Sequence, residues 1–544
     1  MLPSVEEGDS CVACLSISSR HSVLHCTINV TADHKLHFNP SKSTTTFFTT
    51  NKHLYNYHPK LVFESQELIY EKHPKYLGFV LDPEFTSNKH IEHITLKARK
   101  RLNILKYIAG RDWGADATTL RTTFLALIRP ILEYGSPIFC CASETNLNKL
   151  EQVQLSAARI IASLKQSYPA NIAHYEANLL RLHTRRQASL VKYYSKLLSF
   201  GQHNKTSEYL SNWIFSQRLR KNSPFSQIVF QNLLVDNVEP HSLHSSLNPS
   251  EDLPEVFFHF NLPAPVNKKE FLPEHLKQLA LEIIHSIPKQ DAKIFTDGSK
   301  IDSPAGSGVY IETPDEKFSL CQRNPDFCSV FRSELLAINR GLEFVMQNDL
   351  YLKNLWIFSD SRSSLQHLNN RTQIGVKTSI SIVNNLKLLS LQHNIHLQWV
   401  PSHIGIYGND LADSLAKEGC SQPHPTSYDL TYLELYSLKK SQLLRDWLIP
   451  PTHHWYKGNK PGASLTLPFE RRVCTTICRL ATGHLKGLLF SEGTKTYPLC
   501  PKCHLHRTSA DHILNCLGLL WEDIYSTPLL VFDFLQVNGF IDLV

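Results

Sequence analysis

Five residues between 289 and 422 have the types and the spacing needed to work together chemically: Asp297, Glu334, Asp360, His403 and Asp413. Asp297 and Asp360 each follow a run of strand-forming residues, and Glu334 lies in the first turns of the helical run between them. Neighbouring strands of one sheet would bring both aspartates to the same edge, and a helix packed across that sheet would add the glutamate. His403 lies in a glycine-containing loop, and Asp413 lies on the helical run that follows it.

Clustered carboxylates are costly unless a cation neutralises them, because like charges at close range cannot all stay ionised. Hard oxygen ligands suit Mg²⁺ or Mn²⁺, and two such ions roughly 3.5–4 Å apart can support an in-line phosphoryl displacement. His403 would then move protons near the leaving group. Each residue alone also has a plain structural interpretation: Asp297-Gly298 is a common turn signal, Glu334 complements a helix dipole, and a loop histidine is usually solvated.

The elements that would position these residues are those of an α/β domain at 289–422. The sequence predicts strands at 292–296, 304–312, 355–359 and 395–400, and helices at 331–348 and 409–419. The first two strands are expected to pair as a hairpin. Asp297 and Asp360 are expected at the carboxyl ends of their strands.

The segments "FTDGS", "FRSELLAI", "IFSDSRSSL" and "WVPSHIGIYGNDLADSLA" resemble, in order and spacing, the motifs of ribonuclease H. The resemblance implies a ribonuclease H-like mixed sheet with helices, and cleavage of the RNA strand of RNA–DNA hybrids. It also implies that Asp297, Glu334, Asp360 and Asp413 hold two Mg²⁺ ions, with Mn²⁺ as a substitute, and that His403 assists turnover. Hybrid recognition would rest on 2′-hydroxyl contacts in the minor groove.

The flanking sequence resembles the polyproteins of jockey-type non-LTR retrotransposons. The segment "PKYLGFVLDPEFTSNKHIEHI" resembles the end of a reverse transcriptase palm, and "LIRPILEYGSPIFCCASETNLNKLEQVQLSAARIIAS" resembles the helical thumb that follows. The expected organisation is therefore multidomain. It comprises a truncated palm remnant at 1–90, a helical thumb-like region at 91–217, a proline-rich linker with one short helix at 218–288, the α/β domain at 289–422, and a Cys/His-containing tail at 423–544.

Polymerisation needs paired aspartates on a palm hairpin, and the sequence contains no Asp-Asp dipeptide. We therefore expect no reverse transcriptase activity from this chain alone, and a polymerase-competent retroelement protein would be its partner. Between Lys89 and Lys106, six Lys or Arg residues accompany one glutamate. This stretch fits either a helix that follows a phosphate backbone or a solvated helix face.

The tail contains four candidate zinc ligands with the spacing C-x2-C-x8-H-x3-C: Cys500, Cys503, His512 and Cys516. Soft ligands at these separations suit a closed, structural, tetrahedral Zn²⁺ site that resembles a zinc knuckle. Unbound cysteines in a reduced protein are the alternative, and His504 and His506 are competing ligands. Cys11 and Cys14 have no convincing partners.

The composition is that of a folded chain: 544 residues, 42% hydrophobic and 19% charged, with a net charge of +7 that permits a nucleic-acid partner. We see no signal peptide and no membrane span. Thirteen scattered cysteines favour a reducing compartment, so an intracellular location, cytoplasmic or nuclear, is expected. Two functions stay open, a ribonuclease of RNA–DNA hybrids and a catalytically inactive nucleic-acid-binding remnant of a retroelement.

Overall fold

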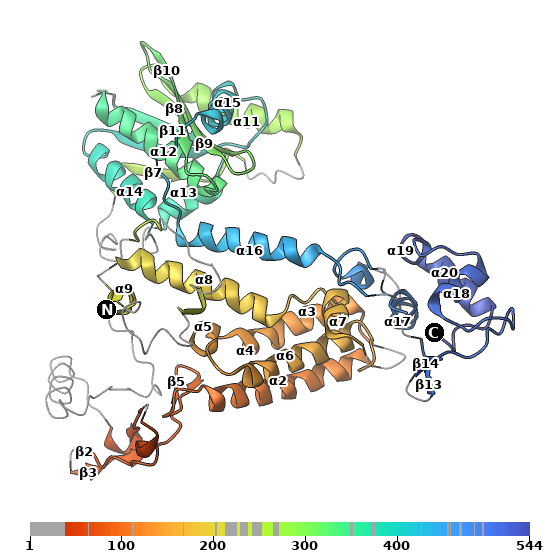
Figure 1. Cartoon of the computed structure of the whole chain (residues 1–544). Coiled ribbons are helices and arrows are strands. Elements are labelled where there is room, and N and C mark those ends of the chain that lie inside the picture. The colour runs from red at the N-terminus through yellow and green to blue at the C-terminus, as the bar shows by residue number, and fades with distance from the viewer. Residues whose placement is uncertain are drawn as a thin grey trace. The chain divides into compact units, whose positions relative to one another are not determined.

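The structure is a computed structural model. It describes residues 39–49, 51–63, 65–110, 114–166, 168–201, 204–212, 226–228, 238–241, 253–264, 271–348, 352–370, 374, 376–425, 427–453, 456, 458–466, 470–483, 485–491 and 494–544. Cys11 and Cys14 lie outside these residues. The chain forms two compact units, Met1–Gln187 with Leu443–Val544, and Ala188–Gln442. Each unit is described by itself, and Figure 1 labels the elements.

The unit Ala188–Gln442 is built on a six-stranded mixed sheet with the strand order β10-β9-β8-β11-β12-β7. Strands β8, β9 and β10 pair antiparallel, whereas β8, β11, β12 and β7 run parallel. The strands are β7 Val256–His259, β8 Ala292–Lys300, β9 Ala305–Glu312, β10 Lys317–Asn324, β11 Asn354–Ser359 and β12 Asn394–Trp399. The helices are α8 Leu182–Phe200, which begins in the other unit, α9 Lys205–Asn212, α11 Pro273–Ser286, α12 Val330–Gln347, α13 Arg362–Asn369, α14 Lys377–Leu389, α15 Tyr407–Ser421 and α16 Tyr432–Leu448.

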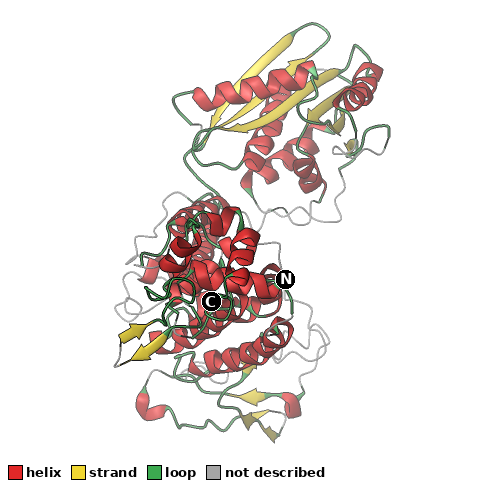
Figure 2. Cartoon of the chain, turned by 90° about the vertical axis from the view of Figure 1, so that its right-hand side faces the viewer, coloured by secondary structure: helices red, strands yellow, loops and turns green. Residues whose placement is uncertain are grey.

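Helices cover both faces of this sheet (Figure 2). Helix α12 packs on β8 and β9 with α14 beside it, and α15 packs on β8, β9 and β10. A glycine makes the close approach of α15 possible, because a Cβ at Gly308 would lie 2.1 Å from the carbonyl oxygen of Ala412. Gly308 pairs with Asp297, and paired residues share a face of a sheet. The side chain of Asp297 therefore lies on the face that α15 covers.

The predicted ribonuclease H-like mixed-sheet α/β fold is confirmed, but the sheet begins earlier in the chain than the sequence indicates. Residues Val256–His259 form β7, which pairs with β12, and α11 contributes Leu276, Leu279 and Ile284 to the core. These segments fall in the expected linker at 218–288. Prolines on both sides of this strand make it difficult to predict from the sequence. Its apolar side chains become part of the domain only through pairing with β12.

The unit Met1–Gln187 with Leu443–Val544 is mainly helical. Its helices are α2 Asn88–Ala109, α3 Ala117–Leu127, α4 Arg129–Glu133, α5 Ser136–Phe139, α6 Glu144–Ile161, α7 Ala170–Glu176, α17 Arg471–Ala481, α18 Ala510–Leu517, α19 Asp523–Ser526 and α20 Pro528–Val537. Its short strands are β1 Thr44–Thr45, β2 Val62–Phe63, β3 Gln66–Glu67, β4 Ile69–Tyr70, β5 Lys75–Tyr76, β6 Phe79–Val80, β13 Leu489–Ser491 and β14 Thr494–Thr496. None of the helices in the described part of the chain combines the length and the apolar character that a bilayer crossing needs.

Buried polar contacts join the thumb-like helices to the C-terminal segment. The guanidinium of Arg471 in α17 donates to the carbonyl oxygen of Ile161 at the end of α6, at 2.9 Å. The hydroxyl of Tyr456 donates to the carboxylate of Glu176 in α7, at 2.5 Å. Residues from Leu443 onward thus form one compact unit with residues 1–187. The sequence predicts separate regions for these two parts of the chain. Single buried contacts of this kind leave no periodic signal in the sequence.

Candidate active site

The structure places Asp297 inside β8 and not at its end. The strand continues to Lys300, and Gly298 pairs with Ser307 across the β8–β9 ladder. The turn interpretation of Asp297-Gly298 is therefore wrong. Glycine is required for a different reason, because a Cβ at this position would lie 2.4 Å from the amide nitrogen of Glu334. The first turn of α12 rests directly on the backbone of β8, next to Asp297.

Three of the predicted carboxylates come together. Oxygens of Asp297, Glu334 and Asp360 all lie within 4.8 Å of one another. The parallel register of β8 and β11 pairs Thr296 with Ser359, so the two aspartates that follow are neighbours. The indole nitrogen of Trp399 donates to the carbonyl oxygen of Asp360 at 3.1 Å and fixes the backbone where β11 ends.

Asp413 lies at the edge of this group. Its carboxylate accepts a hydrogen bond from the ammonium of Lys417 one turn along α15, at 2.6 Å, and its side chain is 23% exposed. It interacts with Asp297, because its charge adds to burial and the charge of Asp360 in raising the pKa of Asp297, and the two side chains share a hydrogen bond. His403 is exposed in the loop between β12 and α15 with a φ of 56°. Within the described residues it makes no hydrogen bond or ion pair.

Burial makes this group of carboxylates energetically costly. Asp297 is 6% exposed and Glu334 is 5% exposed. Burial, together with the charges of Asp360 and Asp413, raises the pKa of Asp297 to about 7. Burial and the charges of Asp297 and Asp360 also raise the pKa of Glu334 well above its ordinary value. The buried Oε2 atom of Glu334 has no hydrogen-bond partner. Converging hard oxygen donors, one of them unpartnered, fit a divalent cation such as Mg²⁺.

Comparison with known proteins decides the family. Residues 289–421 match the sequence profile named RNase H. Over 136 residues the chain is 31% identical to the ribonuclease H of Ruthia magnifica subsp. Calyptogena magnifica, which covers 23% of this chain and 90% of that protein. The chain belongs to the ribonuclease H family.

Two other proteins are similar to the chain at lower identity. The chain is 25% identical to a probable RNA-directed DNA polymerase from transposon BS of Drosophila melanogaster over 170 residues, and this match spans 30% of the chain but 19% of that protein. The N-terminal RNase H domain of a Mycobacterium tuberculosis protein, solved as a fusion with maltose-binding protein, aligns with a TM-score of 0.20 and 19% identity. That alignment covers 24% of this chain and 93% of that chain.

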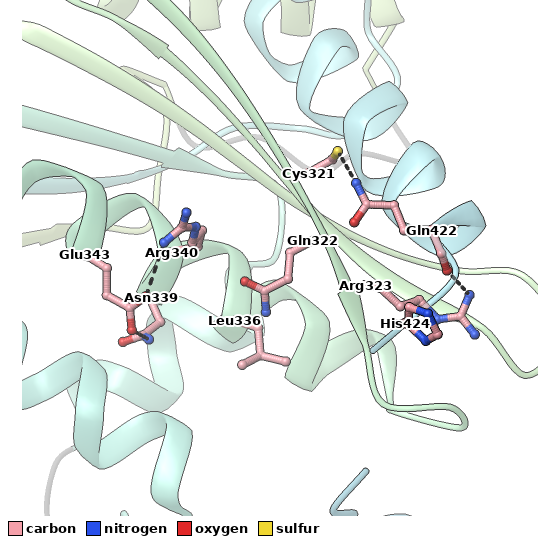
Figure 3. A pocket seen from close by; sticks show the side chains of 9 residues that line it. All are labelled: Cys321, Gln322, Arg323, Leu336, Asn339, Arg340, Glu343, Gln422 and His424. Carbon is pink, nitrogen blue, oxygen red and sulfur yellow. Dashed lines mark hydrogen bonds and ion pairs between the residues drawn. The ribbon is translucent and has the colours of Figure 1, made fainter. Parts of the chain in front are cut away.

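A cavity of about 530 Å³ lies elsewhere in the ribonuclease H domain, between β10 and α12 (Figure 3). Side chains from these two elements line it, together with Gln422 and His424 beyond α15. None of the five predicted catalytic residues lines this cavity, so it is separate from the carboxylate site.

A second cluster, in the C-terminal segment, brings together the four predicted zinc ligands. Ligand atoms of Cys500, Cys503, His512 and Cys516 lie within 4.8 Å of one another. The sulfurs of Cys500 and Cys516 are 3.8 Å apart, and the sulfur of Cys503 is 3.4 Å from Nε2 of His512. Helix α18 presents His512 and Cys516 four residues apart on one face.

The local backbone supports thiolate at this cluster. The amides of Leu505 and His506 donate to the sulfur of Cys503 and lower its pKa. Burial and the neighbouring Cys500 raise the pKa of Cys516 to about 11. Four converging N and S donors at these separations fit Zn²⁺. The competing candidates His504 and His506 are outside this group, and His506 instead accepts the amide of Cys500 through its carbonyl oxygen at 2.8 Å.

Replacing Gly298 by alanine is expected to lower both stability and activity. The new Cβ would lie 2.4 Å from the amide nitrogen of Glu334 and 2.7 Å from the carbonyl carbon of Ser333, which are backbone atoms. The helix must move away, at a cost of about 1–3 kcal/mol, and Glu334 moves with it. Thermal unfolding and cleavage rates measure both effects. Ser299→Ala, at the next residue of β8, is the control and should leave both nearly unchanged.

Metal-free protein is expected to lose stability as the pH rises. The pKa of Asp297 is about 7 in the folded state and 3.8 is its ordinary value, so the folded state binds the proton more tightly. Stability therefore falls as the pH rises from near 4 through about 7, by a few kcal/mol. Thermal unfolding in EDTA at a series of pH values measures this loss, and Mg²⁺ at pH 8 should reverse it. An unchanged or rising melting temperature across this range would contradict the expectation.

Proposed function

We propose that the ribonuclease H domain hydrolyses the RNA strand of RNA–DNA hybrids at the carboxylate site. The observation that carries this proposal is the buried group of Asp297, Glu334 and Asp360, whose oxygens lie within 4.8 Å of one another around an unpartnered carboxylate atom. The ribonuclease H relatives support the choice of substrate class.

In this proposal the four carboxylates hold two Mg²⁺ ions, for which Mn²⁺ can substitute. When bound, the ions would lower the pKa of a water and neutralise charge on the phosphate that is cleaved. Asp297 and Asp360 supply ligands from adjacent strands, and Glu334 supplies one from α12. Asp413 supplies one from the rim, where it forms an ion pair with Lys417. His403 moves a proton to the leaving oxygen from its exposed loop.

The wider setting is also a proposal. We infer that the chain is part of a jockey-type retroelement polyprotein that removes the RNA template after first-strand synthesis inside the cell. Its similarity to the Drosophila transposon polymerase supports this setting. A polymerase-competent retroelement protein is the partner that we propose for this setting. Basic residues of α2 are exposed opposite its buried apolar face and would follow a phosphate backbone: Lys97, Arg99, Lys100, Arg101 and Lys106.

We further propose that Cys500, Cys503, His512 and Cys516 bind one structural Zn²⁺. The buried sulfur of Cys500, which belongs to the apolar core of the C-terminal segment, supports a structural role. A closed set of four protein ligands leaves no open position for catalysis.

A panel of four labelled substrates tests the substrate class. The full chain with Mg²⁺ should cut the RNA strand of an RNA–DNA hybrid and leave its DNA strand, duplex DNA and single-stranded RNA intact. Duplex RNA should also resist cleavage, because a ribonuclease H site requires a DNA partner strand. Equal cleavage of duplex RNA and hybrid would reject the proposed substrate. No cleavage of any substrate by a folded chain would favour the inactive remnant.

A further inference from the structure

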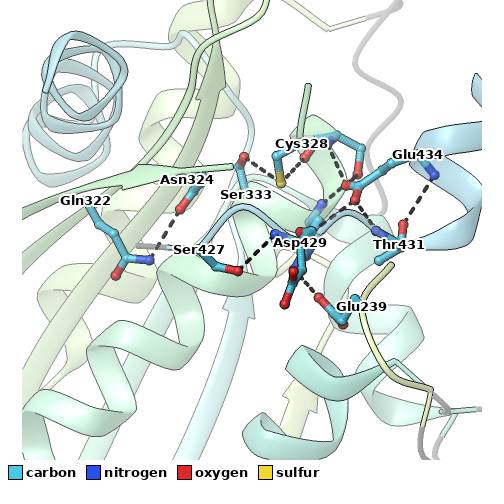
Figure 4. A network of polar contacts seen from close by, with 11 residues as sticks. Glu239, Gln322, Asn324, Cys328, Ser333, Ser427, Asp429, Thr431 and Glu434 are labelled. Carbon is cyan, nitrogen blue, oxygen red and sulfur yellow. Dashed lines mark hydrogen bonds and ion pairs between the residues drawn. The ribbon is translucent and has the colours of Figure 1, made fainter. Parts of the chain in front are cut away.

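Figure 4 shows a network of polar contacts that includes Glu239, Asp429 and Glu434. Buried ion pairs of this network hold the start of α12, the helix that carries Glu334. The side chain of Arg332, 8% exposed, lies two residues before Glu334. Its guanidinium donates to Oε2 of Glu434 at 3.1 Å and to the carbonyl oxygen of Asp429 at 3.0 Å. Its other terminal nitrogen donates to Glu239. Both acidic partners lie outside residues 289–421, where the family similarity is found.

Glu434 connects the beginnings of two helices. Its Oε1 atom accepts the amide of Ser329 at 2.7 Å and the hydroxyl of Ser329 at 2.9 Å, and Ser329 is the N-cap of α12. Its Oε2 atom accepts the amide of Thr431, which precedes α16, at 2.9 Å. Thr431 and Glu434 have capping-box spacing, and the Thr431 hydroxyl accepts the amide of Glu434 at 3.3 Å. One carboxylate therefore caps α16 and ties it to the start of α12.

The same turn of α12 is held on its other side by the sheet. The hydroxyl of Ser307 in β9 donates to the carbonyl oxygen of Ser333 at 2.6 Å, and Gly298 of β8 lies directly beneath the amide of Glu334. The Glu334 carboxylate itself ends in an unpartnered oxygen. Its place among the aspartates therefore depends on how firmly the backbone of this turn is fixed.

We propose that Arg332 is a positioning residue for divalent-cation binding, and that Glu239 and Glu434 extend the catalytic unit beyond the family's usual bounds. This inference rests on the proposed function, because it concerns how Glu334 meets the cation. Groups that orient metal ligands typically change metal affinity about 10–100-fold when they are removed. A guanidinium group that pairs with two carboxylates is suited to positioning a helix turn. Its planar geometry fixes the direction of the hydrogen bonds as well as balancing the charge.

The test uses the full chain and measures Mn²⁺ binding from the electron paramagnetic resonance signal of free Mn²⁺. One variant combines Arg332→Met, Glu239→Gln and Glu434→Gln, which leaves no unpaired charge in the core and should therefore fold. The milder variant is Arg332→Lys, which keeps the positive charge and loses the planar guanidinium that donates to two carboxylates. Both are expected to bind Mn²⁺ about ten-fold more weakly and to need correspondingly more Mg²⁺ for cleavage. The KM for the hybrid should not change.

Asp291→Ala is the matched control, because Asp291 is a buried carboxylate of the same unit, 4% exposed, that precedes β8 and accepts a hydrogen bond from Asn354 instead of facing the site. It should lower the melting temperature and leave Mn²⁺ affinity unchanged. The inference is overturned if either Arg332 variant folds and binds Mn²⁺ as the wild type does. If the wild type binds Mn²⁺ no better than Asp297→Asn, the proposed function itself fails.

Discussion

Replacing Asp297 by asparagine is expected to lower the rate of hybrid cleavage by about a thousand-fold or more, while the domain stays folded. The cations are expected to supply several kcal/mol of transition-state stabilisation, and each 1.36 kcal/mol is a factor of ten in rate. Asparagine keeps the size of the side chain and removes the charge that holds the ion. Asp297 lies at the centre of the site, since its carboxylate interacts with Asp360 and Asp413 and lies within 4.8 Å of Glu334.

The same substitution should raise stability in the absence of metal. Asp297 is 6% exposed, and the charges of two other carboxylates disfavour its ionised form. Removing one of several like charges lowers that repulsion, so the melting temperature in EDTA at pH 8 should rise. Loss of activity together with gain of metal-free stability separates a ligand from a residue that merely supports the fold.

Asp291→Asn provides the control for this pair of measurements. It makes the same chemical change at a buried aspartate that precedes the same strand, where Asn354 donates to both carboxylate oxygens at 3.0 Å. We expect a modest loss of stability and unchanged cleavage. If both Asp→Asn variants keep wild-type cleavage, Asp297 does not bind a catalytic ion.

Zinc removal is expected to have the largest effect on the stability of the C-terminal segment. Structural Zn²⁺ contributes on the order of 10 kcal/mol to the folding of small zinc domains. In this segment the proposed ligand Cys500 is fully buried in a core that also contains Ile513, Leu514 and Phe540. Without the ion, the cysteine sulfurs would be crowded together with no cation to hold them. A chelator or Cys516→Ser should therefore unfold this segment at a much lower temperature.

Metal analysis of the purified chain, together with thermal unfolding, measures this effect. One zinc per chain is expected in the wild type, and none in Cys516→Ser. Cys141→Ser is the matched variant, because Cys141 is also a half-buried free cysteine of the same unit and lies outside the cluster. It should keep the zinc. A wild type without zinc, whose unfolding ignores a chelator, would show that the four residues are ordinary reduced cysteines and a histidine.

Sequence alone predicted that three carboxylates of the candidate site come together, because simple rules connect their positions to the chain. Alternation and turn signals located β8 and β11, and parallel pairing brings Asp297 and Asp360 together. The helical pattern located α12 and Glu334. The strand end at Asp297 was misplaced, because an Asp-Gly pair is a turn signal unless a helix packs against the glycine. That contact with Glu334 depends on tertiary packing.

The ion pairs that hold the start of α12 could not be predicted from the sequence. Glu239 and Glu434 are far from Arg332 in the chain, and nothing local marks either as its partner. The spacing of Thr431 and Glu434 does predict a capping box, but not that the same carboxylate also caps α12. Strand β7 was missed because its partner, β12, lies more than a hundred residues away.

The most direct measurement of the central claim follows cleavage of an end-labelled RNA–DNA hybrid by the full chain as Mg²⁺ is increased, with Asp297→Asn measured in parallel. We expect the wild type to cut the RNA strand only when Mg²⁺ is present, and the variant to remain inactive at every Mg²⁺ concentration while staying folded. Equal cleavage by both proteins, or cleavage that persists in EDTA, would contradict a cation-dependent site built on these carboxylates.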